Sequence, residues 1–196
     1  MKIKTIQTST GENVYVIDDV FRAHQLVSFN KFFINSYFML KGKSDDTLDT
    51  QANIFFMARY NETDEQNLGF FETPEFIEIQ NKFLQGLTFS RTSWVNCSTH
   101  LTPYISHVDE SKNVLAKTVI FYANLKWGSD WGGETLIANN LGETELAIEF
   151  RPNRILVFDS VLLHRACPIT LESKSYYRLT YTKQFNISVE SEQIND

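Results

Sequence analysis

Hydrophobic positions follow two different periods along this chain. Near its beginning, the segments at about residues 20–37 and 75–84 repeat apolar side chains every three or four residues, the spacing of one helix face. From residue 88 onward the period falls to two, which is typical of β-strands with one buried face. Helices followed by many short strands predict an α+β protein, with a double-stranded β-helix (jelly roll) core that N-terminal helices support.

The helical segments have recognisable starts. Asp18 and Asp19 follow a strand-like stretch, residues 13–17, and are side chains that favour a helix N-cap. They predict a helix from about Val20 to Tyr37. Its apolar stripe would consist of Phe21, Leu26, Phe29, Phe33 and Tyr37. Thr73-Pro74-Glu75 predicts a second start, because proline suits the first helical position.

Polar turns separate a series of short alternating segments, and each of these predicts a strand. The expected strands are Ile54–Ala58, Trp94–Thr99, His100–Val108, Leu115–Leu125, Thr135–Ala138, Glu145–Phe150, Arg154–Phe158 and Tyr177–Phe185. Sixteen Phe and eight Tyr are many for this length, and they favour an aromatic core in a β-rich protein.

The segment from Lys41 to Ala52 lacks any apolar period and carries Asp45, Asp46 and Asp49. Such a composition predicts a surface loop. A loop of about a dozen residues is often a cover of a functional site, so our hypothesis is a lid over the primary substrate. Its acidic side chains would favour a neutral or basic substrate.

Length and composition restrict the possible classes of protein. At 196 residues the chain is long enough for one domain with a sizeable core and short for two. We therefore expect a single domain over residues 1–196, with helical support mainly in 18–90 and the jelly-roll core mainly in 91–187. Hydrophobic residues make up 42% and charged residues 21%, as in ordinary globular proteins.

Charge and targeting features point to a protein of the cytoplasm. The net charge is −6 and no basic block occurs, so nucleic-acid binding is not expected. No secretory signal is evident, and no apolar run approaches the roughly 20 residues that a membrane helix needs. Cys97 and Cys167 are too few for a disulfide framework, and we interpret both as small buried residues rather than nucleophiles. The oligomeric state cannot be deduced from these features.

The pattern His107-Val108-Asp109, with His164 far downstream, contains the ligands of a non-haem iron site. Two imidazoles and one carboxylate can hold Fe(II) on one face and leave the remaining coordination positions open. In a strand, residues two apart point to the same side, so His107 and Asp109 would face one point. His164 follows the apolar run at 155–158, as expected for a ligand near a strand end. His100 is a competing ligand, seven positions before His107.

A carboxylate receptor is predicted in the last strand. Alternation in Tyr177-Arg178-Leu179-Thr180-Tyr181 places Arg178 and Thr180 on one face. A guanidinium with a hydroxyl beside it is suited to the far carboxylate of a dicarboxylic acid. Arg165 is the second candidate for this role, although it directly follows His164 and should face away from it.

These residues resemble a known family, the Fe(II)- and 2-oxoglutarate-dependent dioxygenases, and within it the prolyl 4-hydroxylase branch. The resemblance extends over residues 94–186, and the opening at 14–21 is also similar to the start of these domains. An H-x-D pair alone is a weak signal, whereas the ordered series is specific. Its members are Tyr104-Ile105-Ser106-His107-Val108-Asp109, Thr118-Val119-Ile120-Phe121-Tyr122-Ala123-Asn124-Leu125, Trp131-Gly132-Gly133-Glu134-Thr135, Arg154-Ile155-Leu156-Val157-Phe158, His164 and Arg178-Leu179-Thr180. The chain departs from the family between His164 and Arg178, which are fourteen positions apart, and Glu172-Ser173-Lys174-Ser175 is expected to form a loop in the extra length.

The resemblance implies an enzyme and a role for each site residue. Fe(II) would be held by His107, Asp109 and His164, and 2-oxoglutarate would bind the iron. Arg178, helped by Tyr122 and Thr180, would fix its distal carboxylate, while Thr135 is expected to line that pocket and Tyr104 to lie near the substrate. O₂ would be consumed, a C–H bond hydroxylated, and succinate and CO₂ released, with ascorbate as an expected reductant. The resemblance favours a prolyl residue of a peptide or protein as substrate.

Three alternatives stay open. The same chemistry could act on a free amino acid, a nucleobase or another small molecule, because substrate-facing loops are the least matched part of the chain. The protein could instead be a metal-binding jelly roll without oxygenase activity, such as a sensor or a scaffold subunit. Tyr122 also has a simpler interpretation, in which its ring packs in the core and its hydroxyl reaches only the rim of the pocket.

Overall fold

The computed structural model describes residues 1–41, 55–89, 93–102, 105–111, 114–173 and 177–187. The helices are α1 (Ala23–Ile34), α2 (Glu62–Leu68), α3 (Pro74–Phe83) and a 3₁₀ turn, η1 (Ser129–Trp131). The strands are β1 (Lys2–Gln7), β2 (Asn13–Asp18), β3 (Met39–Lys41), β4 (Phe55–Tyr60), β5 (Thr88–Phe89), β6 (Ser93–Ser98), β7 (Ala116–Tyr122), β8 (Thr135–Ala138), β9 (Thr144–Ile148), β10 (Arg154–Asp159), β11 (His164–Ala166) and β12 (Arg178–Asn186).

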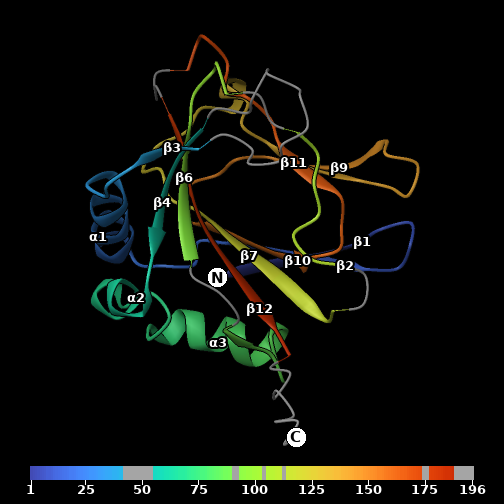
Figure 1. Cartoon of the computed structure of the whole chain (residues 1–196), viewed down its shortest axis with the longest axis horizontal. Coiled ribbons are helices and arrows are strands. Elements are labelled where there is room, and N and C mark those ends of the chain that lie inside the picture. Colours follow the sequence, from blue (N-terminus) through green and yellow to red (C-terminus); the bar gives the residue numbers. More distant parts are fainter. Residues whose placement is uncertain (42–54, 90–92, 103–104, 112–113, 174–176, 188–196) are drawn as a thin grey trace, which may run out of the picture.

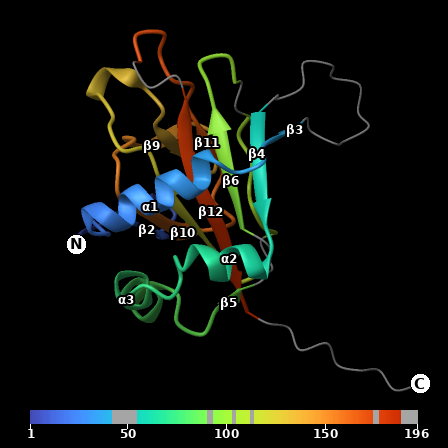
Figure 2. The ribbon, with the colours of Figure 1, turned by 90° about the vertical axis from the view of Figure 1, so that its left-hand side faces the viewer.

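Among the described residues the strands form two antiparallel sheets. The large sheet has the order β1-β2-β10-β7-β12-β6-β4-β3, with β5 paired to β12, and the small sheet has the order β11-β8-β9. The three helices lie along one face of the large sheet, as Figures 1 and 2 show from two directions. The small sheet lies on the side away from the helices. The predicted α+β jelly roll with N-terminal helical support is therefore confirmed.

Strand alternation separates two cores on the two faces of the large sheet. On β7, Val119 and Phe121 pack among the helices, whereas Ile120 and Tyr122 pack toward the small sheet. The helical core is rich in aromatic side chains, as the Phe and Tyr content predicts. Phe21, for example, makes edge-to-face contacts with Phe29, Phe70 and Phe121 at centroid distances of 5.0–5.2 Å.

The first helix is shorter than predicted. It begins at Ala23 rather than near Val20 and ends at Ile34, and Tyr37 is 86% exposed instead of buried in an apolar stripe. The prediction that Asp18 or Asp19 caps the helix is wrong. Gln25 accepts a hydrogen bond from the Arg22 amide at 2.8 Å at the actual start.

The second predicted helix is confirmed, and one helix was missed. Thr73 caps α3 by accepting a hydrogen bond from the Phe76 amide at 3.2 Å, and Pro74 occupies the first turn. The missed helix, α2, is only seven residues long and has few apolar side chains. Reciprocal bonds between Asn61 and Asp64 define its start, at 2.9 and 3.0 Å.

The strand predicted at residues 100–108 is not formed in its described part. Residues 100–101 form a turn, and His107 makes only an isolated bridge to another strand. Strands β1, β3, β5 and β11 were missed, and the other predicted strands are present with end shifts of at most three residues. None of the described helices is long and apolar enough to cross a membrane. The proposed lid at residues 41–52 lies outside the described residues except for Lys41, the last residue of β3.

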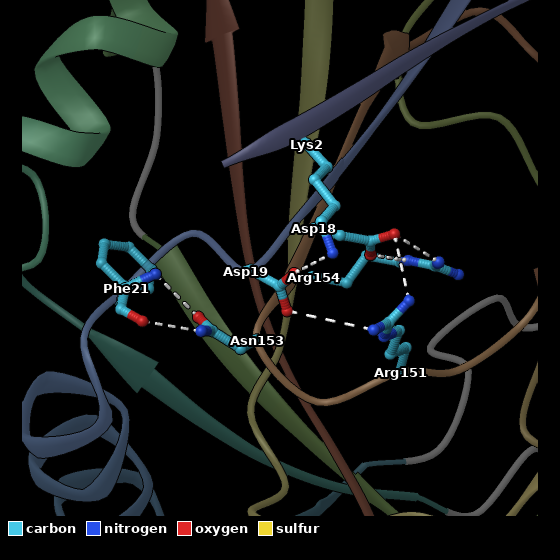
Figure 3. Close-up of polar contacts among 7 residues, drawn as sticks. All are labelled: Lys2, Asp18, Asp19, Phe21, Arg151, Asn153 and Arg154. Atoms are coloured by element: carbon cyan, nitrogen blue, oxygen red, sulfur yellow. Dashed lines mark hydrogen bonds and ion pairs between the residues drawn. The ribbon is translucent and has the colours of Figure 1, made fainter.

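The aspartates that failed as caps join β2 to the turn before β10 (Figure 3). Arg154 donates to both carboxylate oxygens of Asp18, at 2.6 and 3.0 Å, and to the Glu149 carbonyl at 2.6 Å. Beside this pair, Asn153 has a positive φ of 63° and its side chain bonds both the amide and the carbonyl of Phe21. These bonds turn the chain before the helix can begin.

Removing the Asp18 carboxylate should destabilise the fold. Asp18→Ala leaves the guanidinium of Arg154, a residue only 9% exposed, without its anion, so the free energy of unfolding should fall by about 2–4 kcal/mol. Lys2→Ala is the control, because the Lys2–Asp19 pair at 3.3 Å is largely exposed and should contribute below about 0.5 kcal/mol. Urea unfolding of the three proteins measures both values, and equal losses would contradict the prediction.

The same pair predicts a pH dependence. Burial alone would raise the pKa of Asp18, but the hydrogen bonds and charge of Arg154 outweigh it and hold the pKa below the ordinary 3.8. The carboxylate therefore contributes stability above its unfolded pKa, and this contribution disappears as the pH falls through the lower folded value. The difference in unfolding free energy between wild type and Asp18→Ala should be constant near neutrality and shrink below about pH 4.

Candidate metal and carboxylate-binding site

His107 and His164 are joined through their backbones. Each amide donates to the carbonyl of the other residue at 2.9 Å, which forms an isolated antiparallel bridge. His164 is the first residue of β11 in the small sheet, so the bridge attaches the segment of His107 to the edge of that sheet. The two imidazole centroids are consequently only 4.4 Å apart.

Backbone carbonyls orient both imidazoles in the same way. Nδ1 of His107 lies 3.1 Å from the Ile105 carbonyl, and Nδ1 of His164 lies 2.9 Å from the Leu162 carbonyl. Because a carbonyl oxygen can only accept, Nδ1 carries the proton in each ring and Nε2 has a free electron pair. Both Nε2 atoms face Asp109, each 3.6 Å from one of its carboxylate oxygens.

These three side chains form a compact group of potential ligands. Their donor atoms all lie within 4.8 Å of one another. Burial lowers the pKa of His164, and the neighbouring His107 adds to this effect while Asp109 opposes it. The lowered pKa of His164 favours its neutral imidazole, the form that binds a metal. Two imidazoles and a carboxylate are a donor set that fits Fe(II).

Asp109 itself is held from several sides. Its amide donates to the Ser160 carbonyl at 2.8 Å, and its own carbonyl accepts from Gln184 at 3.2 Å. The Thr118 hydroxyl donates to the carboxylate at 2.6 Å. The carboxylate position is therefore determined by β7, β12 and the turn after β10, and not by the strand that the H-x-D spacing predicts.

A cavity of about 70 Å³ extends from this group to Arg178. Its lining includes His107, Asp109, Ile120, Thr135, His164, Ala166, Arg178 and Thr180. A larger groove of about 720 Å³ lies between α1 and β4 and includes no residue of the histidine–aspartate group. The small cavity thus joins the two kinds of side chain that the sequence singled out, a potential metal-binding group and a guanidinium.

Arg178 is a buried cation that contacts neutral oxygen atoms. It is 3% exposed, and its Nε donates to the Gly133 carbonyl at 2.8 Å. Its terminal nitrogens contact the hydroxyls of Thr135 at 3.1 Å and Thr180 at 3.5 Å. Within the described part of the chain no carboxylate pairs with it. The predicted neighbours Thr135 and Thr180 are both brought to it.

Two aromatic rings lie close to this guanidinium. Its central carbon lies 5.4 Å from the ring of Tyr122 and 5.2 Å from that of Phe150, which stack on each other. The Tyr122 hydroxyl donates to Thr135 at 2.7 Å, and the residue is fully buried. The ring of Tyr122 therefore packs in the core, as its simpler interpretation expects, and its hydroxyl is linked to the cavity lining through Thr135. Burial raises the pKa of this phenol, and the charge of Arg178 only partly counteracts the rise.

Two glycines permit the close approach of the chain to Arg178. Gly132 and Gly133 have φ values of +69° and +80°, a region that other residues rarely adopt. A Cβ on Gly133 would lie 3.0 Å from the Trp127 ring and 3.2 Å from Cδ of Arg178. Gly132 and Gly133 are therefore needed for the backbone conformation of this segment, because only glycine adopts these positive φ values readily.

The remaining candidate residues either do not line the cavity or lie outside the described residues. His100 is exposed in a turn, and Arg165 is exposed on β11, so neither joins the group. Cys97 and Cys167 are half-buried free thiols, and burial raises the pKa of both. Tyr104 lies outside the described residues.

Several residues in or beside the cavity were missed by the sequence analysis. Trp94, Asn96 and Thr182 line it, and the carbonyl oxygen of the Asn96 side chain is buried without a hydrogen-bond partner among the described residues. Period-two alternation does place Trp94 and Asn96 on one face of β6, opposite Thr182 and Thr180 of β12. The sequence does not reveal which face is the cavity face, because the pairing of β6 with β12 spans more than eighty positions.

Comparisons with known proteins agree with this geometry. The family model of the 2OG-Fe(II) oxygenase superfamily matches residues 93–186, which contain all three members of the histidine–aspartate group and Arg178. No curated protein matches the chain in sequence.

Solved structures with a similar fold include oxygenases of different specificity. A prolyl hydroxylase from Trichoplax adhaerens, solved with a peptide fragment of the hypoxia inducible factor oxygen degradation domain, has 18% identity and a TM-score of 0.66 over 89% of this chain and 83% of its own. A Pseudomonas putida prolyl-4-hydroxylase has 15% identity and a TM-score of 0.63 over 88% and 92%. SnoK, an α-ketoglutarate-dependent carbocyclase of nogalamycin biosynthesis, has 12% identity and a TM-score of 0.60 over 88% and 79%.

The family match and the fold lead to one conclusion. The matched residues run from β6 to β12. They include every residue that lines the cavity, from both sheets. The structural neighbours cover most of this chain and share its double-stranded β-helix architecture. Over residues 93–186 the chain is thus similar in sequence to the 2OG-Fe(II) oxygenase superfamily, and its fold agrees with that similarity.

Proposed function

We propose that this protein is an Fe(II)- and 2-oxoglutarate-dependent dioxygenase that hydroxylates an unactivated C–H bond, with release of succinate and CO₂. One observation carries the proposal. A potential metal-binding group and a buried guanidinium with no described carboxylate partner share one cavity. Burying a cation without an anion raises the free energy of the folded protein. A short dicarboxylate is an anion that could contact both the metal and Arg178.

His107, Asp109 and His164 would hold the metal through Nε2 of each imidazole and one carboxylate oxygen. When bound, Fe(II) together with 2-oxoglutarate and O₂ supplies the oxidising chemistry. The chain has the simpler tasks of presenting neutral imidazoles, fixing the carboxylate and limiting the access of water. The exposed side of His107, whose side chain is 53% accessible, leaves one approach to the group open.

Arg178 would bind the distal carboxylate of 2-oxoglutarate. Its Nε donates to the Gly133 carbonyl, and each terminal nitrogen has one N–H directed to Thr135 or Thr180, which leaves the second N–H of each and the Thr180 hydroxyl hydrogen for the ligand. Tyr122 and Thr135 would act together, since Tyr122 donates to Thr135, whose oxygen also accepts from Arg178. Tyr122 is thus a support of this receptor, and direct donation to the ligand requires its hydroxyl to leave Thr135.

The primary substrate would lie against the wall formed by Trp94 and Asn96. The buried Asn96 oxygen needs a donor, and 2-oxoglutarate offers none at neutral pH because its oxygens only accept. A peptide prolyl residue is the substrate that we favour, supported by the fold likeness to two prolyl hydroxylases. Its ring can pack on the indole of Trp94 while a neighbouring amide pairs with Asn96.

A small-molecule substrate is the second candidate, favoured by the fold likeness to the carbocyclase SnoK. The iron-loaded protein should release succinate from 2-oxoglutarate under air. Stimulation of this release by a prolyl peptide library, with hydroxyproline found by mass spectrometry, would support the first candidate. Stimulation by free amino acids or small metabolites alone would support the second. Absence of succinate release under every condition would identify a metal-binding protein without oxygenase activity.

Asp109→Ala should remove the metal site. Loss of a first ligand should lower Mn²⁺ affinity by more than about 100-fold, because loss of an outer partner alone typically costs 10–100-fold. Equilibrium dialysis against Mn²⁺, an inert substitute for Fe(II), measures this loss. His100→Ala is the control and should bind as wild type does. Loss of binding in His100→Ala with retention in His107→Ala would show that the ligands are wrongly assigned.

Arg178→Ala should weaken the co-substrate and not the metal. Removing one partner of a buried charge pair costs roughly 2–5 kcal/mol, so the Kd of 2-oxoglutarate should rise by about 100-fold or more. Mn²⁺ affinity should change little. Calorimetric titration of the Mn²⁺-loaded proteins separates the two effects, and Arg165→Ala is the matched control. Equal losses of affinity for 2-oxoglutarate and Mn²⁺ in Arg178→Ala would contradict the role of Arg178 in co-substrate binding. Wild-type affinity for both in Arg178→Ala would point to Arg165 instead.

Gly133→Ala should weaken 2-oxoglutarate binding through the position of Arg178. Its Cβ would press on Cδ of Arg178, and we expect a roughly 10-fold rise in Kd, equivalent to about 1.4 kcal/mol. Gly142→Ala is a matched control, because Gly142 has the same φ of +80° but nothing within 4 Å of an added Cβ. The control should lose stability without losing affinity. Equal affinity in both variants would mean that the approach at Gly133 does not position Arg178.

A further inference from the structure

We propose that Ser160 and Thr118 form a directed hydrogen-bond relay that fixes the carboxylate of Asp109 and reserves one of its oxygens for the metal. Thr118 and Ser160 are then positioning residues that act through Asp109. The inference rests on the proposed metal site and adds residues to it that neither the H-x-D pattern nor the C-terminal arginine points to.

The relay is buried and short. Thr118 and Ser160 are each 0% exposed. The Thr118 hydroxyl lies 2.6 Å from Oδ2 of Asp109 and 2.9 Å from the Ser160 hydroxyl. Thr118 is on β7, opposite Phe158 of β10, so its side chain shares the cavity face with Ile120 and Tyr122. Ser160 follows β10 directly.

The chemistry of the three groups sets the direction of the bonds. A carboxylate oxygen can only accept, so the single hydroxyl hydrogen of Thr118 points to Asp109. The bond between the two hydroxyls must then be donated by Ser160 to Thr118. Each hydroxyl hydrogen is committed, and the series runs from Ser160 through Thr118 to Asp109. Because both donors are buried, water does not compete for these positions.

Ser160 also holds the main chain of the same segment. Its carbonyl accepts from the amides of Asp109 at 2.8 Å and Glu110 at 3.1 Å, and its own amide donates to the Ala116 carbonyl at 3.0 Å. Ser160 thus positions the backbone of Asp109 directly and its side chain through Thr118. This is how a ligand outside any regular strand can keep a fixed position.

The relay distinguishes the two oxygens of the carboxylate. Oδ2 accepts from Thr118 and lies 3.6 Å from Nε2 of His164, whereas Oδ1 lies 3.6 Å from Nε2 of His107 and accepts no side-chain hydrogen bond from the described residues. Donation to Oδ2 withdraws electron density from it and prevents rotation of the group. Oδ1 is therefore the stronger ligand, and we infer attachment of the metal through a single oxygen of Asp109.

The test compares variants at Thr118 by direct metal binding. Thr118→Val keeps the shape of the side chain and removes the donor, so Mn²⁺ affinity should fall by about 10–100-fold. Thr118→Ser keeps the hydroxyl and should stay within about 3-fold of wild type. Ser160→Ala removes only the donor to Thr118 and should give an intermediate loss. Dialysis measures affinity without turnover, and thermal unfolding confirms that each variant is folded.

A spectroscopic measurement separates positioning from a general loss of structure. In the Co²⁺-loaded protein, the visible absorption spectrum should change in Thr118→Val, because a freed carboxylate can offer both oxygens, and should be unchanged in Thr118→Ser. If folded Thr118→Val binds Mn²⁺ as wild type does, the relay is overturned while the metal site stands. If wild type itself binds no Mn²⁺, the proposed function and the relay both fail. Should Thr118→Val not fold, wild-type affinity in folded Ser160→Ala overturns the relay.

Discussion

The two-residue period of the central strands β7, β10 and β12 is the constraint on which the rest of this structure depends. In each strand one set of side chains belongs to the aromatic core under the helices, and the other set faces the small sheet and the cavity. A shift of one residue in any of these strands would exchange the two sets. Arg178 and Thr180 reach the cavity, and Thr118 reaches Asp109, for the same reason that Phe121 and Tyr181 reach the core.

The helical core stabilises this register rather than the site itself. Phe33 stacks on Tyr181 at 4.9 Å, and Tyr181 is followed on the same face of β12 by Lys183, which forms a buried ion pair with Glu65 of α2 at 2.6 Å. Contacts of this kind fix which face of β12 turns away from the helices. Functional geometry is thus a consequence of packing on the opposite face, where no candidate site residue lies.

The sequence allowed good predictions where the relevant information is local. His107 and Asp109 lie in one short motif, Arg178 and Thr180 alternate in one strand, and Thr73-Pro74 marks one helix start. Prediction from the sequence failed where the interaction partner of a residue is far away along the chain. Asp18 has the composition of a helix cap, but Arg154, 136 positions away, takes its carboxylate. Thr118 resembles any strand threonine until β7 pairs with β10 and brings Ser160 beside it.

The burial of Arg178 has a consequence for the energetics of the whole protein. A guanidinium that is 3% exposed and contacts only neutral acceptors among the described residues raises the free energy of the ligand-free state. Under the proposed function, 2-oxoglutarate binds the folded chain and not the unfolded one, so mass action links its concentration to the population of folded protein. The stability of the folded protein would then rise with the concentration of 2-oxoglutarate.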